Sequence, residues 1–384
     1  MNHRQRFIAT MHYQPRDRSP LYDFNFWDET LPTWQAQGLP ADIDRSNAGF
    51  YFGLDQSLGS AQAAAWHCGI QAGLLPGFEA RIIEDDGDVF TEVQYDGVIV
   101  RRQRSSVSIP MHVGHTLIDR DSWNRHYKPR LDPDTPGRFP EDWEQRAVIW
   151  RDENRPYPMF IEIGSLFGWI RDWMGIENLA MVVYDDPAWF EQMIETIADL
   201  QIANLRRLFA TGGRFEAACL WEDMCYNAGP LISPTHFRQF LVPQYRRLTE
   251  LLHANGVDIV WVDCDGRIDD LIPLWLDAGV NCMMPVEIGT WGADPVRYRR
   301  EFGRDLRLMG GFDKHILGGS KSAIRQEIQR LAPLVEEGGF IGFADHRVPP
   351  NVPLEPYASY CQTARQIWGR DTALPPMPAA RHLG

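Results

Sequence analysis

The sequence predicts an α/β barrel of the (βα)8 type, and three observations support this prediction. From residue 157 onward, short apolar segments rich in β-branched residues alternate with longer segments whose apolar residues have helical spacing. Acidic residues directly follow several of the short segments, and barrels of this type place their chemistry at the C-terminal ends of the strands. No low-complexity linker divides the chain. We therefore expect residues 1–384 to form a single domain.

The segment 257–287 shows the βα pattern most clearly. Its apolar run 257–262 predicts a strand buried on both faces, Gly279 is placed to end the helix that follows, and a second strand begins near Asn281. The same pattern predicts six strands, over 159–163, 217–220, 258–262, 281–284, 306–309 and 340–343. Helices are expected over 189–208, 234–254, 268–278, 295–302 and 322–337. A first strand over 20–26 brings the count close to eight.

Residues 79–104 have a different pattern, because apolar and polar residues alternate there around two Asp-Gly turns. Such alternation is typical of antiparallel strands joined by tight turns. We therefore expect a three-stranded antiparallel sheet that is inserted into the barrel sequence. It should lie beside the mouth of the barrel, outside the barrel wall.

The net charge, the length of the apolar runs and the spacing of the cysteines exclude several classes of protein. A net charge of −14 argues against nucleic acid or an anionic membrane as the main partner, and no apolar run is long enough to cross a membrane. The first residues lack a secretory apolar stretch. The six cysteines form no CxxC pair, which argues against a disulfide framework and a thiolate zinc finger. We expect a cytoplasmic enzyme that acts on a small molecule, either as a monomer or as a homodimer.

Four residues that follow predicted strands are candidates for metal ligands: Asp263, Asp265, Glu287 and His346. Acidic residues at such positions are often helix caps, and an isolated histidine is often structural. However, Asp263 and Asp265 stand two positions apart, so an extended chain directs both side chains to one side. Oxygen ligands with one imidazole suit zinc, manganese or ferrous iron. The alternative is that a basic neighbour offsets the acidic charge, with Arg267, Lys314 or Arg347 as the candidates.

Further polar residues follow other predicted strands. We expect Glu222 or Asp313 to act as the catalytic acid or base, although Asp313 could equally form a surface ion pair with Lys314. Asp23 near the end of the first strand is a candidate for binding the substrate. Aromatic side chains next to the carboxylates are expected to line the pocket, with ordinary core packing as the alternative; they are Trp221, Tyr226 and Trp291.

Several stretches of the chain resemble the uroporphyrinogen decarboxylase superfamily, which also contains the corrinoid-linked methyltransferases. The resemblance is carried by the stretch beginning WEDMCYNAGP, by DCDG, by DAGVNCMMPVE, by LMGGFDKHIL and by GGFIGFADHRVPPNVPLEPY. It covers about residues 157–368 and implies a (βα)8 barrel. The inserted antiparallel segment is more similar to the methyltransferase-like branch.

The two branches imply different chemistry. The methyltransferases hold zinc with a His-x-Cys pair, a Glu and a Cys, and these positions fall here on Asp263, Asp265, Glu287 and His346, so three of the ligand types differ. This branch implies metal-dependent methyl transfer or demethylation of a small substrate, with a corrinoid carried on a separate protein.

The decarboxylases use no metal and carry a histidine that matches His346. Their arginine-rich amino-terminal motif has no match near Asp23, Asn25 and Asp28. We therefore favour methyl transfer. The alternatives are metal-free decarboxylation, as in porphyrin metabolism, and a barrel that binds a metabolite without catalysis.

Overall fold

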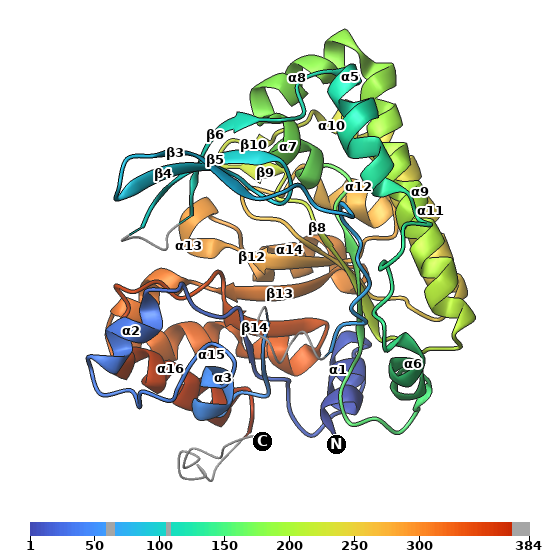
Figure 1. Cartoon of the computed structure of the whole chain (residues 1–384). Coiled ribbons are helices and arrows are strands. Elements are labelled where there is room, and N and C mark those ends of the chain that lie inside the picture. The colour runs from blue at the N-terminus through green and yellow to red at the C-terminus, as the bar shows by residue number, and fades with distance from the viewer. Residues whose placement is uncertain (59–65, 105–108, 371–384) are drawn as a thin grey trace.

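A parallel barrel forms the centre of the computed structural model, which describes residues 1–58, 66–104 and 109–370 (Figure 1). Six parallel strands are hydrogen-bonded in the order β14-β13-β12-β11-β8-β7. They are β7 (Phe160–Gly164), β8 (Ala217–Trp221), β11 (Val260–Asp263), β12 (Cys282–Val286), β13 (Arg307–Phe312) and β14 (Phe340–Ala344). All six lie where the sequence predicted strands, and the (βα)8 prediction is confirmed.

Amino-terminal segments cover both edges of this six-stranded wall. The short strands β1 (Tyr22–Asp23) and β2 (Gln56–Ser57) pair with each other in parallel. Phe26 forms a parallel bridge to Val348, directly after β14, and His67 forms one to Phe160 in β7. The first predicted strand is therefore present, but it is shorter than expected. The prediction of one domain extended to residue 384, and residues 371–384 lie outside the described part of the chain.

The barrel has an apolar interior that is closed at one end by a helix. Phe160, Trp261 and Phe343 belong to an inner cluster that also contains Phe7 from α1 (His3–Met11). The backbone N–H of Gly339, which precedes β14, donates to the carbonyl of Thr10 at 2.7 Å. Helix α1 therefore covers the amino-terminal ends of the strands, and the opposite end is the mouth.

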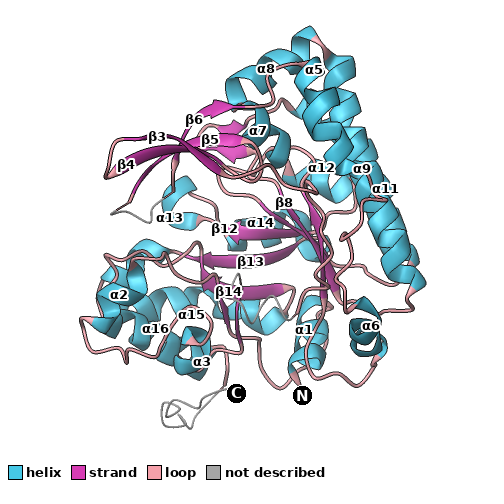
Figure 2. Ribbon diagram, viewed as in Figure 1, coloured by secondary structure: helices cyan, strands magenta, loops and turns pink. Residues whose placement is uncertain are grey.

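Helices surround the strands on the outside (Figure 2). They are α7 (Gly168–Met174), α8 (Ile176–Asp185), α9 (Pro187–Ala210), α11 (Val242–Ala254), α12 (Ile272–Asp277), α14 (Pro295–Phe302), α15 (Lys321–Glu337) and α16 (Leu354–Ile367). The short helix α13 (Ile288–Trp291) follows β12 at the mouth. The predicted helix 234–254 is interrupted by a π-helical turn over Phe237–Leu241, next to Pro243, which has no N–H to donate. Among the described residues, no helix has both the length and the apolar character needed to cross a membrane.

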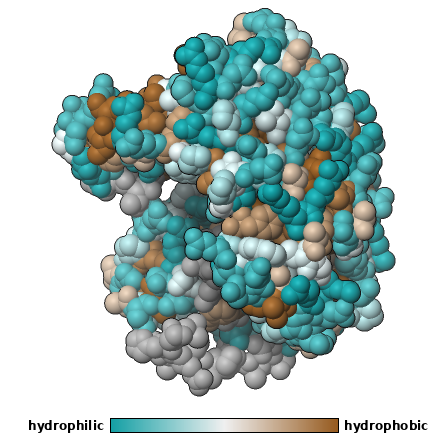
Figure 3. All heavy atoms as spheres, turned by 45° about the vertical axis from the view of Figure 1, so that its right-hand side comes forward, coloured by the Kyte–Doolittle hydropathy of each residue, from teal (hydrophilic) through white to brown (hydrophobic). Residues whose placement is uncertain are grey.

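The inserted segment forms a separate antiparallel sheet of four strands. They are β3 (Arg81–Asp85), β4 (Val89–Val93), β5 (Val98–Gln103) and β6 (Met111–His115), in that order. The first three were predicted and the fourth was missed. The sheet projects as a lobe next to α7, which follows β7, and its surface includes apolar side chains (Figure 3). It is outside the barrel wall, as expected.

An ion pair between the closing helix and the barrel predicts a pH-dependent stability. His12 Nε2 lies 2.9 Å from Asp258 Oδ2, and this hydrogen bond raises the pKa of His12. The stabilisation is therefore complete below the ordinary pKa of about 6.5 and is lost as the pH rises through the raised value. Because Asp258 is mostly exposed, water screens the pair, and His12→Gln should cost at most ~0.5 kcal/mol at pH 5.5.

Thermal unfolding of both proteins at pH 5.5 and pH 9 measures this effect. The variant should melt below the wild type at pH 5.5 and at the same temperature at pH 9. An equal difference at both pH values would show that the charged pair does not stabilise the fold.

Candidate metal centre

Three aspartates converge at the mouth of the barrel. Asp263 is the last residue of β11, Asp265 lies two residues further, and Asp223 follows β8. One carboxylate oxygen from each lies within 4.8 Å of the other two. Asp223 has a φ of +41°, a left-handed conformation that costs a non-glycine residue energy and is frequent at functional sites. The chain therefore gathers three hard oxygen ligands around one point.

The electrostatics of this cluster favour a bound cation. Burial and the charges of Asp223 and Asp265 raise the pKa of Asp263 well above its usual range, and Arg347 opposes this shift. Burial and Asp265 raise the pKa of Asp223 to about 6. Asp265 Oδ1 is buried and accepts no hydrogen bond from the described residues. A divalent ion would offset the repulsion and give this oxygen a partner, so the residues present fit a metal.

His346 lies beside the cluster. Its Nε2 is 3.2 Å from Asp265 Oδ2. The imidazole stacks on Trp27 with a centroid distance of 5.6 Å and meets the ring of Phe24 edge to face at 5.6 Å. Packing on these two rings holds the imidazole next to the carboxylates. It could serve there either as a fourth ligand or as a proton carrier.

Glu287 adjoins the cluster, but donors of the chain already occupy its oxygens. Lys314 Nζ lies 3.3 Å from Oε1, while Oε2 accepts hydrogen bonds from the Gly266 N–H at 3.1 Å and from Trp291 Nε1. The structure thus brings Asp263, Asp265 and His346 together and places Asp223, in place of the expected Glu287, among the grouped carboxylates. Lys314 pairs with Glu287, so the expectation of a surface pair between Asp313 and Lys314 was wrong.

Glu222 is completely buried and serves as a structural anchor. Its two oxygens accept five hydrogen bonds of 2.7–3.1 Å. The donors are the hydroxyls of Ser165 and Tyr245 and the backbone N–H groups of Leu166, Phe167 and Gly168. The assignment of Glu222 as the catalytic acid or base stays a prediction, and these hydrogen bonds give the carboxylate a structural role instead.

Two other predicted residues lie away from the cluster. Asp23 is buried and accepts hydrogen bonds from the Asn25 N–H at 2.9 Å and from the Tyr357 hydroxyl of α16 at 3.2 Å. It therefore contacts an outer helix, and its role as a substrate ligand stays a prediction. Asp313 Oδ1 accepts from the backbone N–H of His315 at 2.9 Å and lies 3.0 Å from Nδ1 of the same residue, which makes it a helix cap.

Aromatic side chains stand next to the carboxylates. Trp221 is in register with Asp263 on the neighbouring strand, and the guanidinium of Arg171 lies 5.3 Å from its ring. Tyr226 contacts Trp291 with a centroid distance of 5.7 Å, and Trp291 donates to Glu287. That these three rings bound the substrate pocket stays a prediction.

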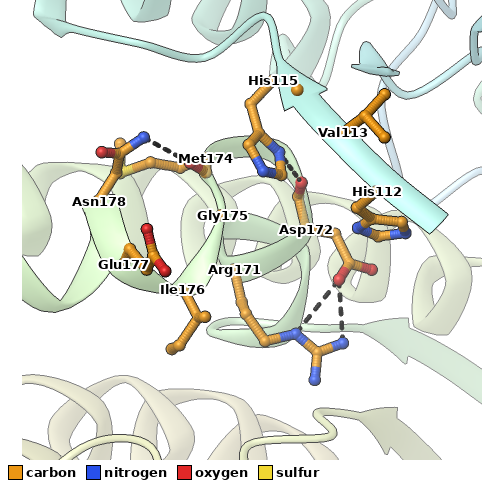
Figure 4. Close-up of a pocket in the computed structure, with 11 residues that line it drawn as sticks. His112, Val113, His115, Arg171, Asp172, Met174, Gly175, Ile176, Glu177 and Asn178 are labelled. Carbon is orange, nitrogen blue, oxygen red and sulfur yellow. Dashed lines mark hydrogen bonds and ion pairs between the residues drawn. The ribbon is translucent and has the colours of Figure 1, made fainter. Parts of the chain in front are cut away.

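A pocket of about 610 Å³ that no sequence pattern indicated lies between β6 and helices α7 and α8 (Figure 4). His112, His115 and Asp172 are among the side chains that line it, and His115 Nδ1 is 2.9 Å from the carbonyl oxygen of Asp172. Arg171 connects the pocket to the carboxylate cluster, because it pairs with Asp172 and donates to the carbonyl oxygen of Asp223. The pocket was missed because β6 was not predicted.

The anchoring role of Glu222 predicts a stability effect. Glu222→Gln removes the charge that five donors surround and converts one acceptor oxygen into a donor group, so it should lower the free energy of unfolding by about 2–4 kcal/mol. Denaturant unfolding measures this loss. The exposed Glu195 of α9 supplies the matched control, since Glu195→Gln should change stability by less than about 0.5 kcal/mol. Equal unfolding midpoints for the two variants would contradict the anchoring role.

Comparison with known proteins places the chain in a family. A family model described as uroporphyrinogen decarboxylase (URO-D) matches residues 152–367. The uroporphyrinogen decarboxylase of Syntrophotalea carbinolica is 25% identical over 182 residues, which cover 46% of this chain and 48% of that protein. The enzyme of the same name from Acidiphilium cryptum is 27% identical over 188 residues, covering 48% and 49%. The chain therefore spans about half the length of these curated relatives.

A solved structure extends the likeness in fold. A methyltransferase from Methanosarcina mazei superposes with a TM-score of 0.57 at 13% identity, covering 95% of this chain and 99% of that one. This likeness agrees with the barrel fold. The matched family model covers more than half of the residues, and the chain belongs to the uroporphyrinogen decarboxylase (URO-D) family.

Proposed function

We propose that the chain is an enzyme that binds a divalent metal ion at Asp223, Asp263 and Asp265 and transfers a methyl group from a small substrate. The observation that carries the proposal is the carboxylate cluster, whose oxygens lie within 4.8 Å of one another and include one without a partner among the described residues. Oxygen ligands next to an imidazole suit zinc, manganese or ferrous iron. We expect zinc first, from the resemblance to the methyltransferases. When bound, such an ion supplies Lewis acidity toward a substrate oxygen or nitrogen.

The residues around the cluster have separate tasks in this proposal. His346 Nε2, fixed by Trp27 and Phe24, holds a proton next to Asp265. Glu287, paired with Lys314, accepts from the N–H of Gly266 and so fixes the turn that carries Asp265. Aromatic side chains at the mouth reduce the access of water to the reacting groups.

The transfer can be written with its atoms and electrons balanced. The bond between the methyl carbon and its oxygen or nitrogen breaks, and the electron pair stays on the heteroatom. The heteroatom takes a proton from His346 Nε2. A nucleophilic acceptor supplies the electron pair for the new bond to carbon, and a reduced corrinoid on a separate protein is the acceptor class that we propose.

Decarboxylation is the second candidate, because the mouth also contains basic residues. His346 and Arg347 follow β14. Burial and then the charge of Arg45 lower the pKa of Arg347, while Asp263 and Asp265 oppose this shift. These groups could bind a carboxylated substrate without a metal. The cluster of three aspartates favours the metal-dependent reaction, since one bound cation would offset the repulsion among all three carboxylates.

The metal proposal predicts the effect of replacing one ligand. Asp265→Asn should lower the affinity for Zn²⁺ or Mn²⁺ by at least about tenfold, since it removes a charged oxygen ligand. Isothermal titration of each ion into the purified chain measures the affinity. The control is Asp270→Asn, five residues further along and exposed, which should bind as the wild type does. Equal affinities in both variants would contradict the proposal.

Activity distinguishes the two candidate reactions. Free cob(I)alamin can be offered as acceptor together with small methoxy and N-methyl compounds, and methylcobalamin is detected by its absorbance. Methyl transfer should be lost on chelation and in Asp265→Asn. Carbon dioxide released from a carboxylated substrate by the chelated enzyme would instead support decarboxylation.

A further inference from the structure

We infer that Arg347 binds an anionic group of the substrate, and that the substrate is a small carboxylate with an apolar body. This inference rests on the proposed function, because it names the class of molecule that the same site takes. It depends on one feature of the mouth, which is a guanidinium that contacts an aromatic ring but has no hydrogen bond or ion pair within the described part of the chain.

Arg347 forms no hydrogen bond and no ion pair with any residue of the described ranges, although it is partly buried. A guanidinium carries five N–H donors in a planar fork, and the fork matches a carboxylate in geometry. Most other arginines that are as little exposed bind carboxylates or backbone carbonyls. Arg155, for example, pairs with Glu216 at 2.6 Å, and Arg138 donates to four backbone carbonyls. The donors of Arg347 are therefore available to a ligand.

Trp27 holds this guanidinium in position. The carbon at the centre of the Arg347 guanidinium lies 5.4 Å from the Trp27 ring, and the same ring stacks on His346. The backbone N–H of Trp27 donates to the carbonyl of Val348 at 3.1 Å, which ties its loop to the segment after β14. Contact with an aromatic ring fixes a guanidinium and leaves its N–H edge open. The open edge is thus kept next to the histidine of the site.

The loop that carries Trp27 also contains a side-chain amide with a free donor, that of Asn25. Asn25 is completely buried with a φ of +72°, and its Nδ2 has no hydrogen-bond partner among the described residues. Its Oδ1 accepts from Arg45 Nε at 3.3 Å, and Arg45 also pairs with Asp28. The entrance is therefore less acidic than the sequence suggested, because Asp28 pairs with Arg45 and Asp23 accepts hydrogen bonds from Asn25 and Tyr357.

An alternative use for Arg347 is to neutralise the cluster. Its charge does lower the pKa of Asp263, but it forms no ion pair with Asp263, Asp265 or any other carboxylate in the described part of the chain. The N–H groups of the guanidinium are therefore not used by the aspartates. A molecule with a carboxylate at one end and a methyl-bearing heteroatom at the other would satisfy both groups, with its body against Phe24 and Trp27.

Benzoate is a suitable probe, because it joins a carboxylate to an apolar ring, and benzamide is its uncharged counterpart. Isothermal titration into the Zn²⁺-loaded full chain should show that benzoate binds to the wild type more tightly than benzamide. Arg347→Gln should weaken benzoate binding by at least about tenfold, since it removes a charge-assisted bidentate contact. Arg347→Lys should give an intermediate loss, because the charge remains and the fork does not.

Two controls make the experiment specific. Arg300→Gln removes the same charge from an exposed position on α14 and should leave benzoate binding unchanged. Circular dichroism should match between Arg347→Gln and the wild type, and the variant should bind Zn²⁺ at least as tightly because a nearby positive charge is removed. These results would show that the fold and the cluster are intact.

The outcomes separate this inference from the proposed function. Benzoate affinity that is equal in Arg347→Gln and wild type would overturn it, as would a wild type that binds benzoate no better than benzamide up to about 10 mM. Neither of these two benzoate results would contradict the proposal that the aspartates bind a metal ion. Conversely, retention of Zn²⁺ by Asp265→Asn would overturn the metal proposal and leave the effect of Arg347 to stand alone.

Discussion

Repulsion among three carboxylates at the mouth of the barrel is the constraint on which the rest of the site depends. Asp223, Asp263 and Asp265 follow two neighbouring parallel strands, β8 and β11, which bring them close together. Burial strengthens their mutual effect, as the raised pKa values of Asp223 and Asp263 show. A folded chain keeps such charges together when a ligand compensates for them. We therefore interpret the cluster as a binding site for a positively charged ligand.

Other buried carboxylates at the mouth form hydrogen bonds that connect the loops, and they are not part of the aspartate cluster. Glu222 fastens the turn between β7 and α7 through five hydrogen bonds. Asp345 accepts from the N–H groups of Ile288, Gly289 and Lys314 at 2.7–3.1 Å, which joins the loops after β12 and β13. Glu287 and Lys314 complete this frame. Each of these carboxylates accepts hydrogen bonds from donors of the chain. Asp265 Oδ1 differs from them, because it has no hydrogen-bond partner among the described residues.

Sequence periodicity was sufficient to predict the six long strands, the helix α14 and the first three strands of the inserted sheet. It could not determine which acidic residue after a strand faces the interior. On β8, Trp221 is in register with Asp263. The chain leaves the extended conformation after Trp221, and the left-handed backbone at Asp223 is a local feature that periodicity does not reveal. On β12, a register shift between Met283 and Val286 changes the direction of the following residues, and Glu287 meets Lys314. Such shifts arise from packing between strands, which a single sequence does not display.

The most direct test of the account is a crystal structure of the chain soaked in Mn²⁺, with anomalous diffraction data to locate the ion. We predict one strong anomalous peak at the mouth, from an ion bonded to oxygens of Asp223, Asp263 and Asp265 at about 2.0–2.6 Å. The ion pair between Glu287 and Lys314 should remain intact. The absence of a peak between the three aspartates, or an ion that Glu287 binds after losing Lys314, would contradict it.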